Sequence, residues 1–444
     1  MSTIGTNGRR AKKEQPVVRR LSTNKPGFEH GVLGIAPAVV EWMAHSPRRS
    51  FIIVFLLAFA IRGFLLTQVP PRRVHPDNPY CHEQVIAMSL IERGEFAGIY
   101  MLPTGPTAHV PPIVPGLIAG IWWLFGTTLT GGYAARLITI AGYSAMYGMI
   151  PWVGGRVGIG RQAGMLAGLA GAVIPERFGN GPALAAIALG LLMIAMVGRW
   201  TSARSSPIGS LLLGLAIGVS FHVQPALLPV AVGFISFELW WSRGRRKWWL
   251  SGLVVIGAML ACIPWGWRNY KVFHEVFFIR SNLGLELRMG NHEGAAASLE
   301  VIVRRKVYRH PEDNEGEALL VQQLGEMEYM RRAKHEAFEW IATHRAVFVR
   351  LTALRFVHFW FGPLHRPITA LGVSLLTLLA LLGARRCLPS MTTPQRAALL
   401  IPLAMFPLIY YLVGFEFRYR MPVNWIVLLL AGAEVWHWIK RRWR

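Results

Sequence analysis

Apolar and polar stretches alternate along the whole chain in a pattern that indicates repeated membrane crossings. An α-helix needs about 20 apolar residues to cross a bilayer core of roughly 30 Å. Several runs are shorter than this, so their ends are placed only to within a few residues. The pattern predicts an all-α polytopic membrane protein with about ten transmembrane helices. The expected spans are residues 51–69, 133–153, 162–174, 182–197, 208–221, 225–241, 248–263, 368–383, 397–413 and 422–439.

Two further apolar segments are interpreted as interfacial helices. Residues 112–125 are short and begin with Pro-Pro, and residues 347–361 carry Arg350 and Arg355 among aromatic and aliphatic side chains. An arginine at mid-membrane costs roughly 2.5–3.5 kcal/mol, and a helix lying in the interface avoids that cost. If both segments crossed, the chain would have twelve spans and the part between them would lie inside.

The distribution of charge predicts the orientation. The 444 residues carry a formal net charge of +24, and only 16% of them are charged, whereas soluble domains have about 25%. Basic residues gather at both ends and in short segments between apolar runs. This is the positive-inside pattern of a membrane protein, so nucleic acid is not an expected partner. We expect a multi-pass protein of the bacterial inner membrane with both termini in the cytoplasm.

This topology divides the chain into four parts. A basic cytoplasmic tail covers residues 1–49. An N-terminal transmembrane module covers 50–264 and includes the first outer loop at 70–125. An outer-face cap covers 265–367 and holds 12 of the 23 acidic residues. Residues 368–444 form the C-terminal transmembrane helices and a basic cytoplasmic end. Helical spacing of apolar residues predicts one helix over 317–343 of the cap.

The first outer loop carries the carboxylates that are the best candidates for chemistry. Asp77 is one of only two aspartates in the chain, and it follows the first span among prolines and aromatic residues. Glu83 lies six residues on, at the start of a helix predicted for 81–93. A carboxylate outside the membrane can act as a general base. Asp77 is the favoured catalytic residue and Glu83 the alternative, although a single loop carboxylate is more often simply solvated.

Several polar residues expected at the outer face are candidates for substrate binding. Arginine forms planar, bidentate contacts with phosphate oxygens, and outside arginines need a partner. Headgroup anchoring or pairing with the acidic cap would also satisfy them. The histidines of the first loop fit no zinc spacing, so no metal ligand is predicted, and a divalent cation stays an open alternative. The binding candidates are His109, Arg268, Asn269, Arg280, Asn282, Arg418 and Arg420.

With these residues in view, the chain resembles the GT-C superfamily of membrane glycosyltransferases. The resemblance is to bacterial relatives of dolichyl-phosphate-mannose protein mannosyltransferases and to the lipid A aminoarabinose transferase. It rests on the acid-bearing first loop and on motifs whose order spans nearly the whole chain. These motifs are AMSLIERGEF at 87–96, TGPTAHVPPIVP at 104–115, PWGWRNY at 264–270, RSNLG at 280–284 and RYRMP at 418–422.

The resemblance implies transfer of a sugar from a polyprenyl-phosphate carrier to an envelope acceptor on the outer face. Asp77 or Glu83 would be the base, and Arg268, Arg418 and Arg420 would hold the carrier phosphate. The chain departs from the family pattern where Asn78 follows Asp77, because an adjacent acidic pair is common there. It departs again where His109 and Val110 precede the Pro-Pro pair in place of a basic residue.

Two other functions compete with this interpretation. A transporter or flippase of lipid-linked substrates would need charged residues inside the spans. Glu238 lies inside an expected span, but only three residues from the end of 225–241. A non-catalytic protein of envelope assembly would tolerate carboxamides at Asp77 and Glu83.

Overall fold

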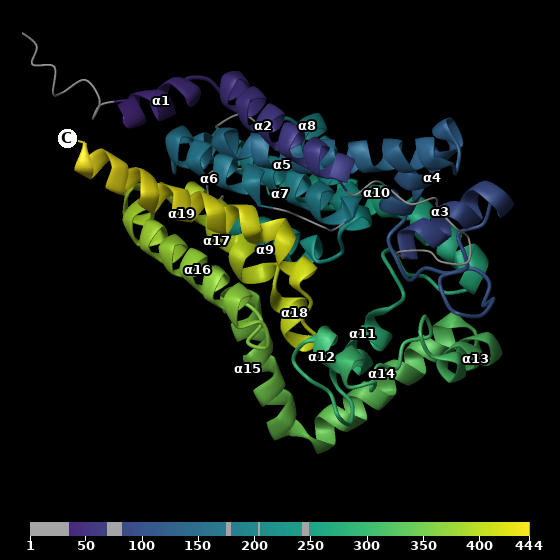
Figure 1. Ribbon diagram of the computed structural model, residues 1–444. Helices are drawn as coiled ribbons and strands as arrows, with labels where there is room; N and C mark the ends of the chain where they lie inside the picture. The colour runs from purple at the N-terminus through teal and green to yellow at the C-terminus, as the bar shows by residue number, and fades with distance from the viewer. Residues whose placement is uncertain (1–34, 69–81, 175–178, 203–204, 242–247, 444) are drawn as a thin grey trace, which may run out of the picture.

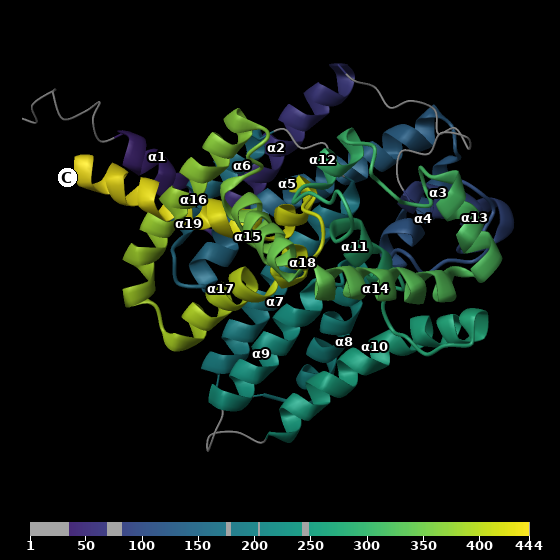
Figure 2. The ribbon, with the colours of Figure 1, turned by 90° about the horizontal axis from the view of Figure 1, so that it is seen from below.

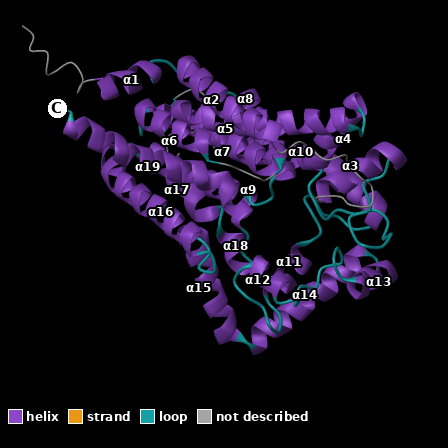
Figure 3. Ribbon diagram, viewed as in Figure 1, coloured by secondary structure: helices purple, strands orange, loops and turns teal. Residues whose placement is uncertain are grey.

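The described part of the chain is built from helices (Figure 3). A computed structural model describes residues 35–68, 82–174, 179–202, 205–241 and 248–443. Within these ranges there is no strand, and β-pairing is limited to the isolated bridges Ala97–Pro106 and Ser298–Phe415. The prediction of an all-α protein is confirmed.

Each of the ten apolar runs contains a helix at the expected place. The bounds differ from the predicted ones by a few residues, and the run at 397–413 is divided between two helices. They are α2 (Pro47–Gln68), α5 (Leu129–Arg156), α6 (Arg161–Val173), α7 (Asn180–Thr201), α8 (Pro207–Val223), α9 (Leu227–Trp241), α10 (Trp249–Phe273), α16 (Pro367–Cys387), α17 (Thr393–Met405) with α18 (Leu408–Leu412), and α19 (Met421–Arg442).

Six helical segments, not ten, are both long and apolar enough to cross a membrane among the described residues. They contain α2, α7, α10, α16, α17 with α18, and α19. The expected count of about ten is therefore not reached by these criteria. The reason differs between helices: α6, α8 and α9 have 13, 17 and 15 residues, whereas α5 has 28 residues but is rich in glycine and tyrosine.

Small residues allow the helices of the bundle to approach closely. A Cβ added at Gly214 of α8 would meet the Val254 carbonyl oxygen of α10 at 2.1 Å, and one at Gly383 of α16 would meet Leu430 O of α19 at 1.9 Å. Close packing through small residues is typical of helices in membranes. The segment that contains α19 is the most buried of the six, with 72% of its most apolar window inside the protein.

The two ends of the bundle carry different elements. Figure 1 shows the C-terminal end of α19 beside α1 (Ile35–Met43), while α3 (His82–Arg93) and the cap lie at the opposite end. Helix α1 buries Val40 against the bundle and leaves Trp42 exposed. This arrangement is the one expected if the basic chain ends share one membrane face.

The cap consists of short helices between α10 and α16. Figure 2 shows α14 passing beside α11, and these two helices pack together. Residues 317–343 are helical, as their spacing predicts, but they form two helices that are separated at Gly325, whose φ of 78° lies in the region that favours glycine. The cap helices are α11 (Leu283–Gly290), α12 (Leu299–Arg304), α13 (Glu315–Leu324), α14 (Glu326–Thr343) and α15 (Arg345–Phe361).

The two segments interpreted as interfacial are both short helices. Helix α4 (Ile113–Phe125) has 13 residues, and α15 has 17. In α15, Arg350 is exposed, whereas Arg355 is fully buried and donates to the carbonyls of Gly290 and Leu412. Arg355 thus fastens α15 to the end of α11 and to α18, which the sequence did not indicate.

Candidate functional site

Three histidines from distant parts of the chain meet at the end of the bundle that carries the cap. His82 begins α3, His109 lies in the loop before α4, and His310 lies between α12 and α13. The rings of His82 and His310 are stacked with centroids 5.5 Å apart, and His109 stands edge-on to His82 at 5.0 Å. Their ligand atoms all lie within 4.8 Å of one another.

Neighbouring side chains orient these rings. The Tyr100 hydroxyl lies 3.1 Å from His109 Nδ1, and the His310 ring stacks on Tyr308. The backbone N–H of Glu312 donates to His310 Nδ1, and His82 Nε2 lies 2.8 Å from the Glu312 carboxylate.

The pKa values of the three histidines are shifted in different directions. Burial lowers the pKa of His109 well below the usual value, with the charges of His82, His310 and Arg280 acting in the same direction. It also lowers the pKa of His310, to about 3. Burial lowers the pKa of His82 too, but the Glu312 carboxylate outweighs this, so the net shift is upward. Of the three histidines, the one with an anionic partner is therefore the one that binds a proton most readily.

The cluster offers a donor set that suits a divalent transition metal. Three imidazoles and the Glu312 carboxylate make four ligands, the number that zinc takes. Ligand nitrogens around one zinc ion lie about 3.4 Å apart, so the rings would have to close in from their separations of up to 4.8 Å. His82, His109, His310 and Glu312 are the residues that could hold such an ion.

Glu83 follows His82 of this cluster at the start of α3. Within the described part of the chain, its side chain makes neither a hydrogen bond nor an ion pair, and it is half-buried. Its charge acts on His82 and on Arg418. Asp77, the favoured base in the sequence, lies outside the described residues, so its position relative to Glu83 stays a prediction.

Arg280 and Arg418 are arginines whose charges act on groups of this site. Arg280 is half-buried and acts on His109 and Tyr410. Across the described ranges, no carboxylate pairs with Arg280. Arg418 pairs with Glu416 at 2.8 Å, remains about half-exposed, and is also influenced by Glu83 and Glu286. The observed ion pair of Arg418 is thus with its own neighbour, whereas the alternative left open by the sequence was pairing with the acidic cap.

The two asparagines among the binding candidates are buried and hold loops in place. Asn282 donates to Glu286 at 3.0 Å and lies 3.5 Å from His109 Nε2. Asn269 donates to the Phe277 carbonyl. Asn282 therefore belongs to the histidine cluster, whereas Asn269 shapes the turn after α10.

Arg268 and Arg420 have contacts that do not favour phosphate binding. Arg268 donates to the carbonyls of Thr107 and Phe96 and lies over the rings of Phe96 and Trp265. Arg420 is fully buried and donates to Thr377 Oγ1 and, at 3.4 Å, to Trp360 O. Both guanidiniums connect helices and loops, and their role in substrate binding stays a prediction.

Several residues of the site were not singled out by the sequence. Three of them lie in the cap, which folds back over the first loop, whereas Tyr410 lies in α18 and Glu416 is two residues from Arg418. The sequence feature that could have pointed to the acidic residues among them is the concentration of acidic residues in the cap. These residues are Glu286, His310, Glu312, Tyr410 and Glu416.

The comparisons with known proteins do not identify a family. No protein-family model, no curated protein and no solved structure matches this chain. The site must therefore be interpreted from its own chemistry.

Proposed function

We propose that this chain is a membrane glycosyltransferase that moves a sugar from a polyprenyl-phosphate carrier to an acceptor at the outer face. The observation that carries the proposal concerns two charged groups beside the histidine cluster: Glu83, which acts on His82, and Arg280, which acts on His109. Neither side chain makes a hydrogen bond or an ion pair among the described residues. A base and a phosphate-binding cation are the two groups that this transfer needs.

A shallow apolar groove beside the site supports a lipid-linked donor. It is lined by Leu90, Ile91, Ala119 and Trp123, on α3 and α4. Glu83 stands at the start of α3, and seven residues of helix separate it from Leu90, or about 10 Å at 1.5 Å per residue. A polyprenyl chain lying in this groove would place its phosphate near the charged cluster.

The reaction in this proposal is a single displacement. The base takes the proton of the acceptor hydroxyl, whose oxygen attacks the anomeric carbon while the lipid phosphate leaves. Arg280 and Arg418 stabilise the charge that develops on the phosphate, and attack opposite the leaving group inverts the anomeric centre. A divalent cation held by His82, His109 and His310 would add positive charge beside that phosphate.

The membrane arrangement in this proposal has ten spans. Helices α5, α6, α8 and α9 pack with the six longer segments and would cross with them. Both chain ends then face the cytoplasm of a bacterial inner membrane, and the cap faces the outer side. The acceptor would be an envelope glycan, lipid or protein.

The test is release of lipid phosphate by the purified full-length protein from a panel of polyprenyl-phosphate sugars. Asp77→Asn and Glu83→Gln are run beside wild type, because removal of a general base slows turnover by about 10²–10⁴-fold. Glu92→Gln is the matched control, since Glu92 is an exposed carboxylate on the same helix. Normal turnover by both Asp77→Asn and Glu83→Gln would show that neither is the base.

The structure gives little support to the transporter alternative. Inside the bundle, Glu238 of α9 pairs with Arg199 of α7 through two contacts of 2.7 Å. Ser210 and Ser251 bind the same pair. A carboxylate engaged in this way serves to join helices, and it is not poised to bind a coupling ion.

A further inference from the structure

The three histidines of the candidate site have the spacing of ligands around one metal ion. The ring centres of His82, His109 and His310 lie 5.0, 5.5 and 5.5 Å apart in the three pairs. A zinc-bound nitrogen lies about 2 Å from the ion, and the imidazole centre lies roughly 1.1 Å farther out, so ring centres on one tetrahedral ion are about 5 Å apart. Because the ring centres already have this spacing, turning of the rings can bring one nitrogen of each to a common ion.

The carboxylate of Glu312 supplies a fourth ligand. One of its oxygens, Oε2, lies 2.8 Å from His82 Nε2 and 3.7 Å from His310 Nδ1. Ligand atoms on one zinc ion are about 3.4 Å apart. A single carboxylate oxygen is therefore near the ligand spacing from two histidine nitrogens at once, which three aromatic rings packed together would not by themselves require.

Two of the histidines present an unprotonated nitrogen, the form that binds a metal. The backbone N–H of Glu312 donates to His310 Nδ1, so this atom is assigned as an acceptor, and a bound ion would take the place of that N–H. The amide nitrogen of Asn282 lies 3.5 Å from His109 Nε2 and can only donate, so Nε2 is also an acceptor. The Nδ1–H of His109 then faces the Tyr100 hydroxyl, a contact of the kind that orients metal-binding histidines.

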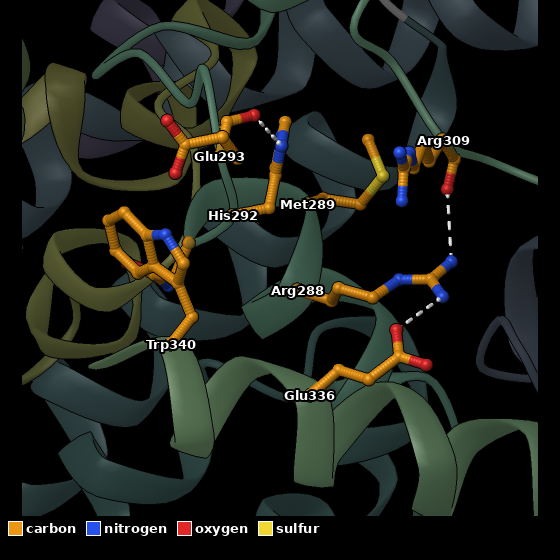
Figure 4. Close-up of a pocket in the computed structure, with 8 residues that line it drawn as sticks. Arg288, Met289, His292, Glu293, Arg309, Glu336 and Trp340 are labelled. Atoms are coloured by element: carbon orange, nitrogen blue, oxygen red, sulfur yellow. Dashed lines mark hydrogen bonds and ion pairs between the residues drawn. The ribbon is translucent and has the colours of Figure 1, made fainter. Parts of the chain in front are cut away.

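Arg288 holds the cap segment that carries His310. Its guanidinium donates to the backbone carbonyl of Arg309, the residue before His310, at 3.2 Å. It also donates to Glu336 at 3.1 Å and to Glu317 at 2.7 Å. Figure 4 shows Arg288 between Arg309 and Glu336, with both contacts drawn. A ligand on a segment fixed in this way is well suited to a metal site, because its position is set before the ion binds.

The donor atoms select the class of metal. Three imidazole nitrogens and one carboxylate oxygen suit zinc and related divalent transition metals, whereas magnesium and calcium prefer oxygen ligands. His109 and His310 are only 3% and 5% exposed. Four protein ligands in a buried position are typical of a structural zinc ion.

We propose that His82, His109, His310 and Glu312 bind one zinc ion that fastens the cap to the first outer loop. The ligands come from the start of α3, from the loop before α4, and from the segment between α12 and α13. The ion would join segments that are far apart in the chain, and so stabilise the folded cap. The proposal does not rest on the sugar transfer, because all four ligands belong to the protein.

The test is zinc binding by the tag-free full-length protein in detergent. The protein is stripped with a chelator, reloaded, and its metal content is measured by inductively coupled plasma mass spectrometry. We expect one zinc ion per chain, and an unfolding temperature that falls on stripping and recovers with zinc but not with magnesium. A protein that does not rebind zinc, or whose unfolding temperature is the same with and without it, would overturn the proposal.

The variants His109→Gln and Glu312→Gln test the ligand set. Loss of an outer contact of a metal ligand usually lowers affinity by about 10–100-fold, so loss of a ligand should weaken zinc binding at least tenfold in competition with a chelating dye. His335→Gln is the matched control, because His335 is exposed on α14 beside Glu339. Wild-type affinity in both ligand variants would overturn the assignment.

A spectroscopic measurement on the wild-type protein does not depend on the folding of any variant. Cobalt(II) can take the place of zinc, and its visible spectrum distinguishes tetrahedral from octahedral coordination. We expect the tetrahedral spectrum, displaced by one equivalent of zinc. An octahedral spectrum would show that the four side chains do not bind the ion together.

The zinc site and the proposed transfer fail separately. Zinc binding without any release of lipid phosphate would count against the transfer alone. Lipid phosphate release by a protein that binds no zinc would count against the zinc site alone.

Discussion

At the scale of single residues, some charged side chains near the site form hydrogen bonds with other segments and others do not. This difference indicates which of them are available to a ligand. Three arginines donate hydrogen bonds to carbonyl or hydroxyl oxygens of other segments, namely Arg268, Arg355 and Arg420. Arg280 has no such partner among the described residues. A guanidinium that is half-buried and unpaired is the better candidate for an anionic ligand.

We predict that Arg280→Gln lowers turnover with polyprenyl-phosphate sugars by about 10²–10³-fold, the loss usually seen when one donor to a developing negative charge is removed. Lipid phosphate release measures this. Arg280→Lys should recover part of the rate because it restores the charge. Arg332→Gln, on the exposed face of α14, is the control. If Arg280→Gln and wild type had equal rates, Arg280 would not contact the phosphate.

A second residue-scale prediction concerns the buried pair of Arg199 and Glu238. Their side chains are only 6% and 3% exposed, and removal of one partner leaves the other charge buried and uncompensated. We expect Glu238→Gln to destabilise the protein by about 3–5 kcal/mol, seen as a lower unfolding temperature in detergent. The double variant Arg199→Met with Glu238→Leu should recover much of the loss. A wild-type unfolding temperature for Glu238→Gln would refute the structural role.

At the scale of elements, the cap is joined to the first outer loop by Glu326 at the start of α14. Its carboxylate accepts hydrogen bonds from the Ala108 N–H at 2.8 Å and from the Ser281 hydroxyl at 2.6 Å. Its other oxygen is buried without a partner in the described structure. Burial raises the pKa of Glu326 although these hydrogen bonds and the Arg268 charge oppose the shift.

The raised pKa predicts how this junction responds to pH. Between 4.5, the unperturbed value, and the raised pKa, the folded carboxyl binds more protons than the unfolded one. The free energy of unfolding therefore falls as pH rises through this window. Glu326→Gln keeps an acceptor oxygen but cannot titrate. We expect its unfolding temperature to fall less than that of wild type between pH 5 and pH 8, and equal pH dependence would contradict this.

At the scale of the whole molecule, the opposite placement of the cap and the chain ends is the feature on which the function depends. Catalysis with an outer-face acceptor requires the cap and Glu83 to lie outside the membrane. Gln323 in the cap and Thr393 at the start of α17 are exposed positions on opposite ends. They offer a direct test of the orientation.

We predict that an impermeant maleimide added outside labels Gln323→Cys and does not label Thr393→Cys until the membrane is opened. The background protein has Cys81, Cys262 and Cys387 replaced by serine. Mass spectrometry of the labelled protein gives the result. Labelling of position 393 from outside, with position 323 protected, would reverse the topology and remove the basis for an outer-face reaction.

The sequence by itself determined the helical elements of this protein. All ten apolar runs contain helices, because burial of a long apolar stretch in lipid leaves the helix as the way to satisfy its backbone. The start of α3 near Glu83 was also predictable. The number of spans was less certain, since α6, α8 and α9 are short and α5 is weakly apolar.

Only the tertiary structure decided which residues meet. His82, His109 and His310 are neighbours because the cap folds over the first loop, a long-range contact that leaves no mark in local periodicity. Tertiary contacts also bury Arg420 and engage the guanidinium of Arg268 in hydrogen bonds to carbonyl oxygens. Both residues stand at motif positions where a phosphate ligand was expected, but their side chains already have protein partners. Local patterns determine helices because helical contacts are local, whereas a site depends on contacts between distant segments, which the sequence pattern does not record.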